Sequence, residues 1–305
     1  MDNAATAVQM LMALVLSPGL IGVINRTKAV FAGRTGQPLL QPYYDLARLL
    51  HKAAVYSRAT TWVFRAGPIA GLGAALVALA VLPFGGVGSP IGFAGDFLLL
   101  AALLAVVRFF LVVAALDTGS AFEGMGASRE VMMSVLAEPA LLLGLAAIAR
   151  QTGSLSLEEM LAGATPGGWL AAAPVLVLVA LALFAIFLAE NARIPVDDPN
   201  THLELTMIHE VMVLDHSGPD LAYILYTSAL KLWLLGTLLL GVLLPLAGAG
   251  PWASLGLLAA GMLMVALAVG VIESVVARLR MSMLPVFLGG TVALSLLALV
   301  IAFRS

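Results

Sequence analysis

Residues 97–116 read FLLLAALLAVVRFFLVVAAL, an apolar run that contains a single charged residue, Arg108. A helix of about 20 apolar residues is long enough to cross the roughly 30 Å hydrocarbon core of a bilayer. The run therefore predicts a transmembrane helix. An ionisable side chain near the middle of such a helix costs at least about 2.5–3.5 kcal/mol on insertion scales, so it is usually retained for a function. We therefore treat Arg108 as a candidate functional residue.

Seven more apolar windows of similar length occur on either side of this run. The chain of 305 residues is 62% hydrophobic and only 10% charged, and a soluble domain cannot bury that much apolar surface. The sequence thus predicts an all-α polytopic membrane protein, with eight transmembrane helices in one membrane domain, residues 1–305. The other windows lie at about residues 4–24, 64–84, 131–149, 171–189, 221–246, 253–276 and 284–303.

The charge balance and the absence of cysteine exclude several kinds of site. The chain has 15 basic and 17 acidic residues, so it lacks the basic surface that nucleic-acid binding requires. Without cysteine it forms neither a disulfide nor a thiolate-ligated iron–sulfur cluster. We therefore expect no cofactor in this chain, and any redox centre must belong to a partner.

Lysine and arginine are concentrated in the connections on one side of the expected bundle, which is typical of the cytoplasmic side. Seven lie between the first window and the start of the second, whereas only Arg150 and Arg304 fall on the opposite side. This pattern predicts that both termini face outside. The basic residues assigned to the cytoplasmic side are Arg26, Lys28, Arg34, Arg48, Lys52, Arg58, Arg65, Arg129, Arg193, Arg278 and Arg280.

An amphipathic helix is expected within the first cytoplasmic connection, at about residues 38–54. Leu46, Leu49 and Leu50 follow helical spacing, and Asp45 and Arg48 mark the opposite face. This pattern favours a helix lying on the membrane surface. Anchoring of a polybasic loop to anionic lipids is the simpler alternative.

The connection at about residues 190–220 is acidic, with seven carboxylates and three histidines between two apolar windows. We expect it to form a proton-conducting funnel that faces a partner. The histidines recur every seven residues, which on a helix places them about 10 Å apart, too far for one zinc ion; we expect hydrogen bonds to the carboxylates instead. A helix-capping role is an alternative for Glu204, with Thr201 as the cap.

Charged residues within the windows extend this funnel into the membrane. Glu130, Ser134 and Glu138 are spaced by four residues, so they share one helical face. Glu190 and Arg193 are close enough in sequence to pair. The alternative is that the buried charges only neutralise one another, but proton relays require such intramembrane acids. The predicted relay comprises Arg108, Glu130, Glu138, Glu190, Asp197, Asp198, Glu204, Glu210, Asp215, Lys231 and Glu273.

Three segments resemble one known family. They are GRTGQPLLQPYYDLARLLHK (33–52), ALDTGSAFEGMGASRE (115–130) and AENARIPVDDPNTHLELTMIHEVMVLDHSG (189–218). Together they resemble the membrane anchor subunit of energy-converting NiFe hydrogenases, such as formate hydrogenlyase and the hydrogenase-4 type. This anchor is homologous to the quinone-site membrane subunit (subunit 1) of respiratory complex I. Glu123 departs from the family, in which a glycine is common at that turn.

The resemblance implies an eight-helix anchor in the bacterial or archaeal cytoplasmic membrane. Its partners would be the NiFe large subunit, a small iron–sulfur subunit and antiporter-like membrane subunits, and the partners would hold the metal centres. A quinone-site subunit of a complex I-type enzyme is the main alternative, and a stand-alone ion transporter is a third. The residues that the resemblance places at the partner-docking surface are Arg34, Asp45, Arg48, Asp117, Arg129 and Arg193.

Overall fold

The computed structural model describes residues 3–162, 166–197, 208–244, 246 and 248–304. Eight helices in this part of the chain are long and apolar enough to cross a membrane, which confirms the predicted fold class. They are α1 (Asn3–Phe31), α3 (Trp62–Val81), α4 (Asp96–Asp117), α5 (Ala121–Thr152), α7 (Pro166–Glu190), α8 (Gly218–Leu243), α9 (Pro251–Val275) and α10 (Leu284–Ala302).

Four shorter elements lie in the connections between these helices. The expected amphipathic helix is present as α2, which is shorter than predicted, and the others follow α5, α7 and α9 in the chain. These elements are α2 (Gln41–Leu50), α6 (Leu157–Leu161), and the 3-10 turns η1 (Val211–Val213) and η2 (Met281–Met283).

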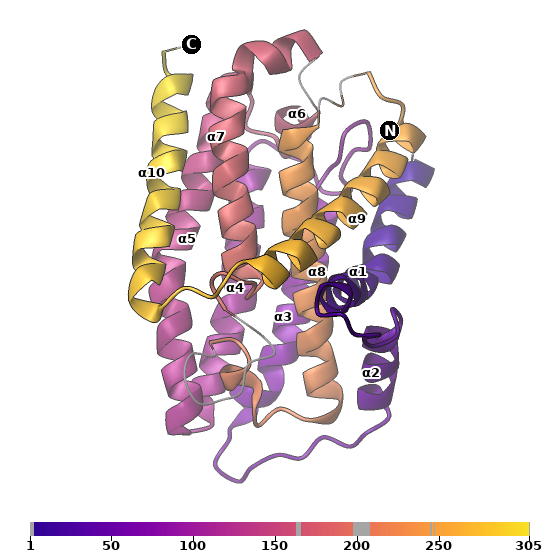
Figure 1. Ribbon diagram of the computed structural model, residues 1–305, viewed down its shortest axis with the longest axis vertical. Coiled ribbons are helices and arrows are strands. Elements are labelled where there is room, and N and C mark those ends of the chain that lie inside the picture. The colour runs from indigo at the N-terminus through magenta and orange to yellow at the C-terminus, as the bar shows by residue number, and fades with distance from the viewer. Residues whose placement is uncertain (1–2, 163–165, 198–207, 245, 247, 305) are drawn as a thin grey trace.

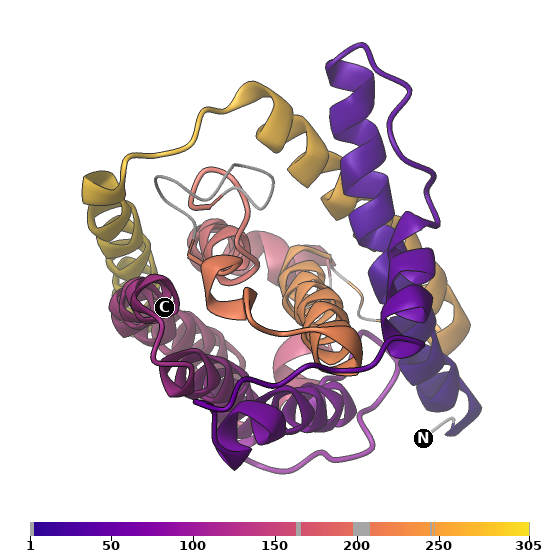
Figure 2. The same cartoon turned by 90° about the horizontal axis from the view of Figure 1, so that it is seen from below.

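Helices α7 and α8 lie inside a ring formed by α1, α3, α4, α5, α10 and α9 (Figure 2). Every residue of α8 from Ala229 to Val242 is buried, as expected of a helix that is apolar on all sides. Lys231 is the charged residue in this buried stretch. The ring therefore keeps one cation at the centre of the bundle, away from lipid.

Both chain termini lie at the same end of the bundle, and α2 lies near the opposite end (Figure 1). The segment 208–217, which carries η1, is also at the α2 end (Figure 2). We call this the α2 end of the molecule. An even number of crossings puts the two termini on one side, in agreement with the predicted topology.

Helix α1 contains a proline, Pro18, which has no N–H to donate to the carbonyl four residues earlier. That carbonyl belongs to Leu14, and it instead accepts a hydrogen bond of 2.8 Å from the Tyr226 hydroxyl of α8. The side chain from the central helix thus satisfies the carbonyl that the proline leaves free.

The next hydrogen bond of α1 is also replaced, by a residue of α2. The Tyr43 hydroxyl accepts a hydrogen bond of 3.1 Å from the Gly19 N–H and donates one to the Val15 carbonyl. These two backbone groups would otherwise bond to each other, because they are four residues apart. Tyr43 therefore inserts into α1 and fixes α2 against the membrane helix.

Candidate functional site

Arg108 lies on α4 with only 6% of its side chain exposed, and it contacts three carboxylates. Its Nη1 donates to Glu138 and its Nη2 donates to Glu190. Its Nε lies 3.3 Å from Oε1 of Glu130. Glu130 and Glu138 come from α5 and point toward the same guanidinium, as their spacing predicts, whereas Glu190 ends α7.

Lys231 joins this group from the central helix, with Nζ 3.6 Å from Oε2 of Glu190. We call Arg108, Glu130, Glu138, Glu190 and Lys231 the Arg108 cluster. Four of its side chains are at most 11% exposed, but that of Glu138 is 44% exposed. The cluster holds two cations and three carboxylates, so one bound proton makes it electrically neutral.

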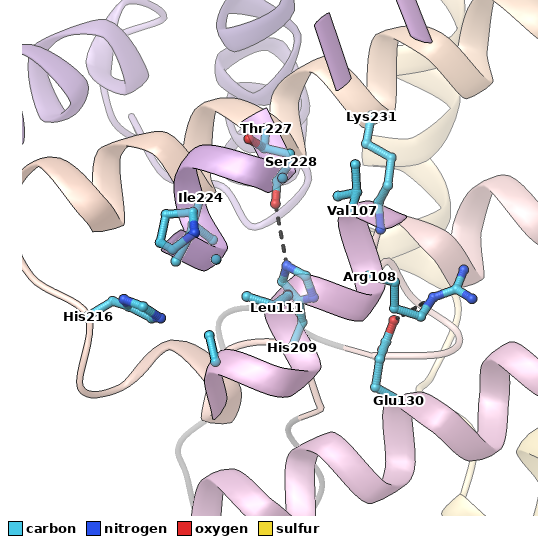
Figure 3. Close-up of a pocket in the computed structure, with 14 residues that line it drawn as sticks. Val107, Arg108, Leu111, Glu130, His209, His216, Ile224, Thr227, Ser228 and Lys231 are labelled. Atoms are coloured by element: carbon cyan, nitrogen blue, oxygen red, sulfur yellow. Dashed lines mark hydrogen bonds and ion pairs between the residues drawn. The ribbon is translucent and has the colours of Figure 1, made fainter. Parts of the chain in front are cut away.

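Three cavities border the cluster. A large cavity of about 530 Å³ lies at the α2 end and is lined by Glu190, together with residues of α1, α2 and α8. A lateral pocket of about 210 Å³ lies between α4 and α5 and is lined by Glu138, Glu190 and Arg108. An inner chamber of about 30 Å³ is lined by Glu130, Arg108 and Lys231 (Figure 3).

Glu273 and Arg193 form a second group of ion pairs, together with Lys28. Glu273 of α9 lies 2.8 Å from Nζ of Lys28 and 3.4 Å from Nη1 of Arg193. The sequence predicts Glu273 in the relay, but its partners are not those of the Arg108 cluster. The resemblance places Arg193 at the docking surface, but its side chain is only 8% exposed, and it pairs with Glu273 and not with Glu190.

The acidic segment after α7 is only partly described. The buried carboxylate of Asp197 accepts hydrogen bonds from the backbone N–H groups of Ile208 (3.0 Å) and His209 (3.3 Å), and so positions His209. Glu210 and Asp215 are exposed, and Glu210 lines the large cavity. Asp198 and Glu204, also expected in the relay, lie outside the described residues, as do His202 and the Thr201 cap.

Glu123 is a buried acid that the predicted relay omits. Its side chain lies at the start of α5 and is fully buried. Oε1 accepts a hydrogen bond of 3.0 Å from the backbone N–H of Asp215. Glu123 therefore fixes the segment 208–217 to α5. The signal in the sequence is its departure from the glycine that is common in the family.

The remaining docking candidates are less buried than Arg193. Arg34 and Arg48 are exposed, Arg129 is half-buried, and Asp45 of α2 pairs with Arg48 at 3.0 Å. Asp117 has a structural role, because it accepts hydrogen bonds from the backbone N–H groups of Thr61, which caps α3, and of Phe64 in its first turn.

Two histidines of the segment 208–217 lie beside the cluster. His209 Nε2 is 3.4 Å from the Ser228 hydroxyl, and burial, aided by the nearby Lys231 cation, lowers the pKa of His209 to about 3. The His216 ring stacks on Phe64 with ring centroids 3.9 Å apart, and burial lowers the pKa of His216 to about 4. Both rings are therefore neutral at physiological pH. Among the described residues, no three His, Asp or Glu side chains are grouped as metal ligands.

The fold and the cluster define a class: a multi-pass membrane protein that holds a branched group of ion pairs between its helices. Within this class the chain belongs to the NADH dehydrogenase family, whose model matches residues 4–303. It is 31% identical over 290 residues to formate hydrogenlyase subunit 4 of Escherichia coli (strain K12), a match that covers 91% of each chain. The resemblance seen in the sequence is thereby confirmed.

Other relatives agree with this assignment. Hydrogenase-4 component C of Escherichia coli (strain K12) is 32% identical over 237 residues, covering 78% of this chain and 74% of the relative. A subunit of the NADH-quinone oxidoreductase of Rubrobacter xylanophilus is 33% identical, but over 55% of this chain and 51% of its own length. One chain in the structure of the membrane-bound sulfane sulfur reductase (MBS), an archaeal respiratory membrane complex, has the same fold, with a TM-score of 0.81, 20% identity and 98% coverage of both chains.

Proposed function

We propose that this chain is the membrane anchor and proton-coupling subunit of a multisubunit NiFe hydrogenase complex of the formate hydrogenlyase or hydrogenase-4 type. It docks the hydrophilic redox subunits and links their electron transfer to ion translocation by antiporter-like membrane subunits. Its similarity along 91% of its length to formate hydrogenlyase subunit 4 supports this assignment. The chain has no cysteine, so we place the NiFe centre and the iron–sulfur clusters in the partner subunits.

The observation that carries the coupling role is the charge of the Arg108 cluster. Three carboxylates and two cations leave one negative charge if every group is ionised. An unbalanced charge away from water is costly, so the cluster favours binding one proton. Arg108 contacts all three acids and so joins them in one electrostatic group. A proton that moves among them is the elementary step of the proposed relay.

The α2 end is the proposed docking surface. It carries α2 and the segment 208–217, and the large cavity lies between it and Glu190. A change of charge in a docked redox subunit would act on the cluster through that cavity, because neighbouring charge shifts the proton affinity of an acid. In this arrangement the α2 end faces the cytoplasm and both termini face the outside of the cytoplasmic membrane.

A second candidate function is supported by the size of the large cavity. Its volume of about 530 Å³ falls in the range of small-molecule sites, roughly 300–1,000 Å³. The chain could therefore serve as the quinone-site subunit of a complex I-type enzyme. The NADH-quinone oxidoreductase relative matches only about half of this chain, which favours the hydrogenase assignment. Inhibition of the assembled complex by quinone-site inhibitors would reverse this order.

The coupling role is tested in the assembled complex, purified with its partners and reconstituted in liposomes. We expect Glu138→Gln and Glu190→Gln each to lower ion translocation at least tenfold, because each removes one proton acceptor from the cluster. Hydrogen turnover with an artificial electron carrier should remain unchanged in both variants, since the metal centres lie in the partners. Mass spectrometry of the intact complex identifies those partners.

The matched control is Glu159→Gln. Glu159 is an exposed acid of α6, which lies at the end of the bundle that carries the termini. This control should translocate ions like the unmodified complex. Full translocation in both cluster variants, or purification of the chain without any metalloprotein, would refute the proposal.

A further inference from the structure

Each carboxylate of the Arg108 cluster borders a different set of cavities. Glu190 lines the large cavity and the lateral pocket, and Glu138 lines the lateral pocket. Of the three carboxylates, Glu130 is the one that lines the inner chamber. Of these three cavities, the inner chamber is therefore the one that reaches Glu130.

The inner chamber and the large cavity share one wall. The residues that line both are His209, His216, Ile224, Ser228 and Lys231. Two of these, His209 and Ser228, contact each other across the wall at 3.4 Å (Figure 3). A neutral imidazole beside a hydroxyl both accepts and donates hydrogen bonds. This pair is a hydrogen-bonding connection between the two spaces.

The chamber itself is lined by polar groups that lack protein partners. The Thr227 hydroxyl and both ring nitrogens of His216 are buried, and none has a hydrogen-bond partner among the described residues. Their side chains belong to residues that are 5% and 4% exposed. Buried polar groups of this kind are normally satisfied by ordered water. The chamber volume of about 30 Å³ accommodates about two water molecules, each of which needs roughly 10–15 Å³ by this measure.

We propose that the inner chamber is a two-water site through which Glu130 exchanges protons with the large cavity, and that His209 carries each proton across the shared wall. This inference rests on the proposed coupling function. A hydronium ion on the cavity side gives its proton to the unprotonated ring nitrogen of His209, while the N–H of the other ring nitrogen releases its proton toward Ser228 and the chamber waters. One proton enters as one leaves, so the ring stores no net charge. The ring is left in its other tautomer, and rotation of the side chain returns it to the first before the next proton arrives.

The charges around His209 agree with this role. Burial and the neighbouring Lys231 hold the pKa of His209 near 3, so a proton that enters the ring is passed on and not retained. Thr227 and His216 would position the waters, and Ser228 would orient the His209 ring. The cluster then has two entrances, one at Glu190 and one at Glu130, which meet at the Arg108 guanidinium.

The test fills the chamber without changing any titratable group. Gly71 lines the chamber, and a Cβ atom there would have only one close neighbour, the Val107 carbonyl at 3.9 Å. Gly71→Val should therefore displace the water while the helix is kept. The matched control is Gly73→Val on the same helix. Gly73 does not line the chamber, and a Cβ atom there meets nothing within 4 Å among the described residues.

Two measurements are made on the assembled complex: water density by cryo-electron microscopy, and ion translocation in liposomes. We expect two waters near Thr227 and His216 in the unmodified complex, their loss in Gly71→Val, and a fall in translocation of about tenfold. Gly73→Val should change neither. A dry chamber in the unmodified complex, or unchanged translocation after the waters are lost, would overturn the inference.

A second pair of variants guards against a folding defect. Thr227→Val removes the hydroxyl at nearly constant volume, and Thr227→Ser keeps it. We expect the valine variant to lose a water and to translocate ions several-fold more slowly. The serine variant should keep both the water and the normal rate of translocation. If the unmodified complex holds the waters but translocates no ions, the coupling function fails and the His209 route fails with it. If the unmodified complex translocates ions and the Gly71→Val complex does so equally well, only the route fails.

Discussion

The Arg108 side chain joins three helices at one point because a guanidinium carries several N–H donors in a rigid plane. Its Nε, Nη1 and Nη2 atoms each approach a different carboxylate. A lysine ammonium is a compact point charge and would not reach all three in fixed directions. The geometry thus explains why an arginine, and not a lysine, occupies the middle of α4.

His216 provides a prediction about stability and pH. Burial holds the pKa of His216 near 4 in the folded protein, whereas an exposed histidine has a pKa of about 6.5. The unfolded chain therefore binds a proton that the folded chain does not between these values. The stability contributed by neutral His216 is complete above pH 6.5 and is lost as the pH falls toward 4, by up to about 3 kcal/mol.

We expect the melting temperature of the detergent-purified protein to fall between pH 6.5 and 4.5, and His216→Phe to reduce that fall. Phenylalanine keeps the stacking on Phe64 but takes up no proton. His51→Phe serves as the control, because His51 is exposed at the end of α2. An equal fall in the His216→Phe and unmodified proteins would contradict the assignment.

At the scale of the element, two tyrosines join α1 to its neighbours, Tyr226 to α8 and Tyr43 to α2. Tyr226 satisfies the carbonyl left free by Pro18, and Tyr43 replaces the next backbone hydrogen bond. Burial raises the pKa of Tyr43, so its hydroxyl stays protonated and available to donate. One hydroxyl group therefore makes both of these hydrogen bonds between α2 and α1.

We predict that Tyr43→Phe loosens α2 without unfolding the bundle. The variant loses both hydrogen bonds to α1, so backbone amides near Gly19 and in α2 should exchange with deuterium about tenfold faster or more. Tyr44→Phe is a strict control, since Tyr44 is the neighbouring residue and is 59% exposed. Unchanged exchange in Tyr43→Phe would show that apolar contacts alone hold α2 in place.

The helices themselves could be predicted because lipid imposes length and hydrophobicity on them. The start of α5 could not. Its apolar window begins near residue 131, whereas the helix begins at Ala121. One face of the added turns packs on protein: a Cβ at Gly126 would lie only 2.9 Å from the Ile208 carbonyl. A hydropathy profile gives no information about such contacts.

At the scale of the whole molecule, the sequence indicates which charges enter the membrane but not which of them meet. The common face of Glu130 and Glu138 follows from their spacing along one helix. That Arg108 pairs with them, whereas Glu273 pairs with Lys28, depends on which helices are neighbours in the ring. Helix α4 packs on α5, and α9 packs on α1. Sequence separation gives no information about this order.

The exposure of Glu138 has a consequence for the life of the protein in the cell. Its side chain is 44% exposed in the wall of the lateral pocket, among the apolar side chains of α4 and α5. A carboxylate that faces acyl chains is costly, and a neighbouring polypeptide would cover it. A copy that is made without its partner subunits, an orphan copy, therefore exposes this carboxylate. Membrane quality control would recognise it as the mark of an unassembled chain.

We expect such orphan copies to be degraded quickly, and Glu138→Gln to lengthen their half-life at least twofold in a pulse-chase measurement. Glu159→Gln, which changes an exposed acid of α6, should leave the half-life unchanged. Equal half-lives for all three chains would rule out Glu138 as the mark. The carboxylate that works in the assembled complex would then also cause unassembled chains to be degraded. The chain would accumulate only as fast as its partner subunits are made.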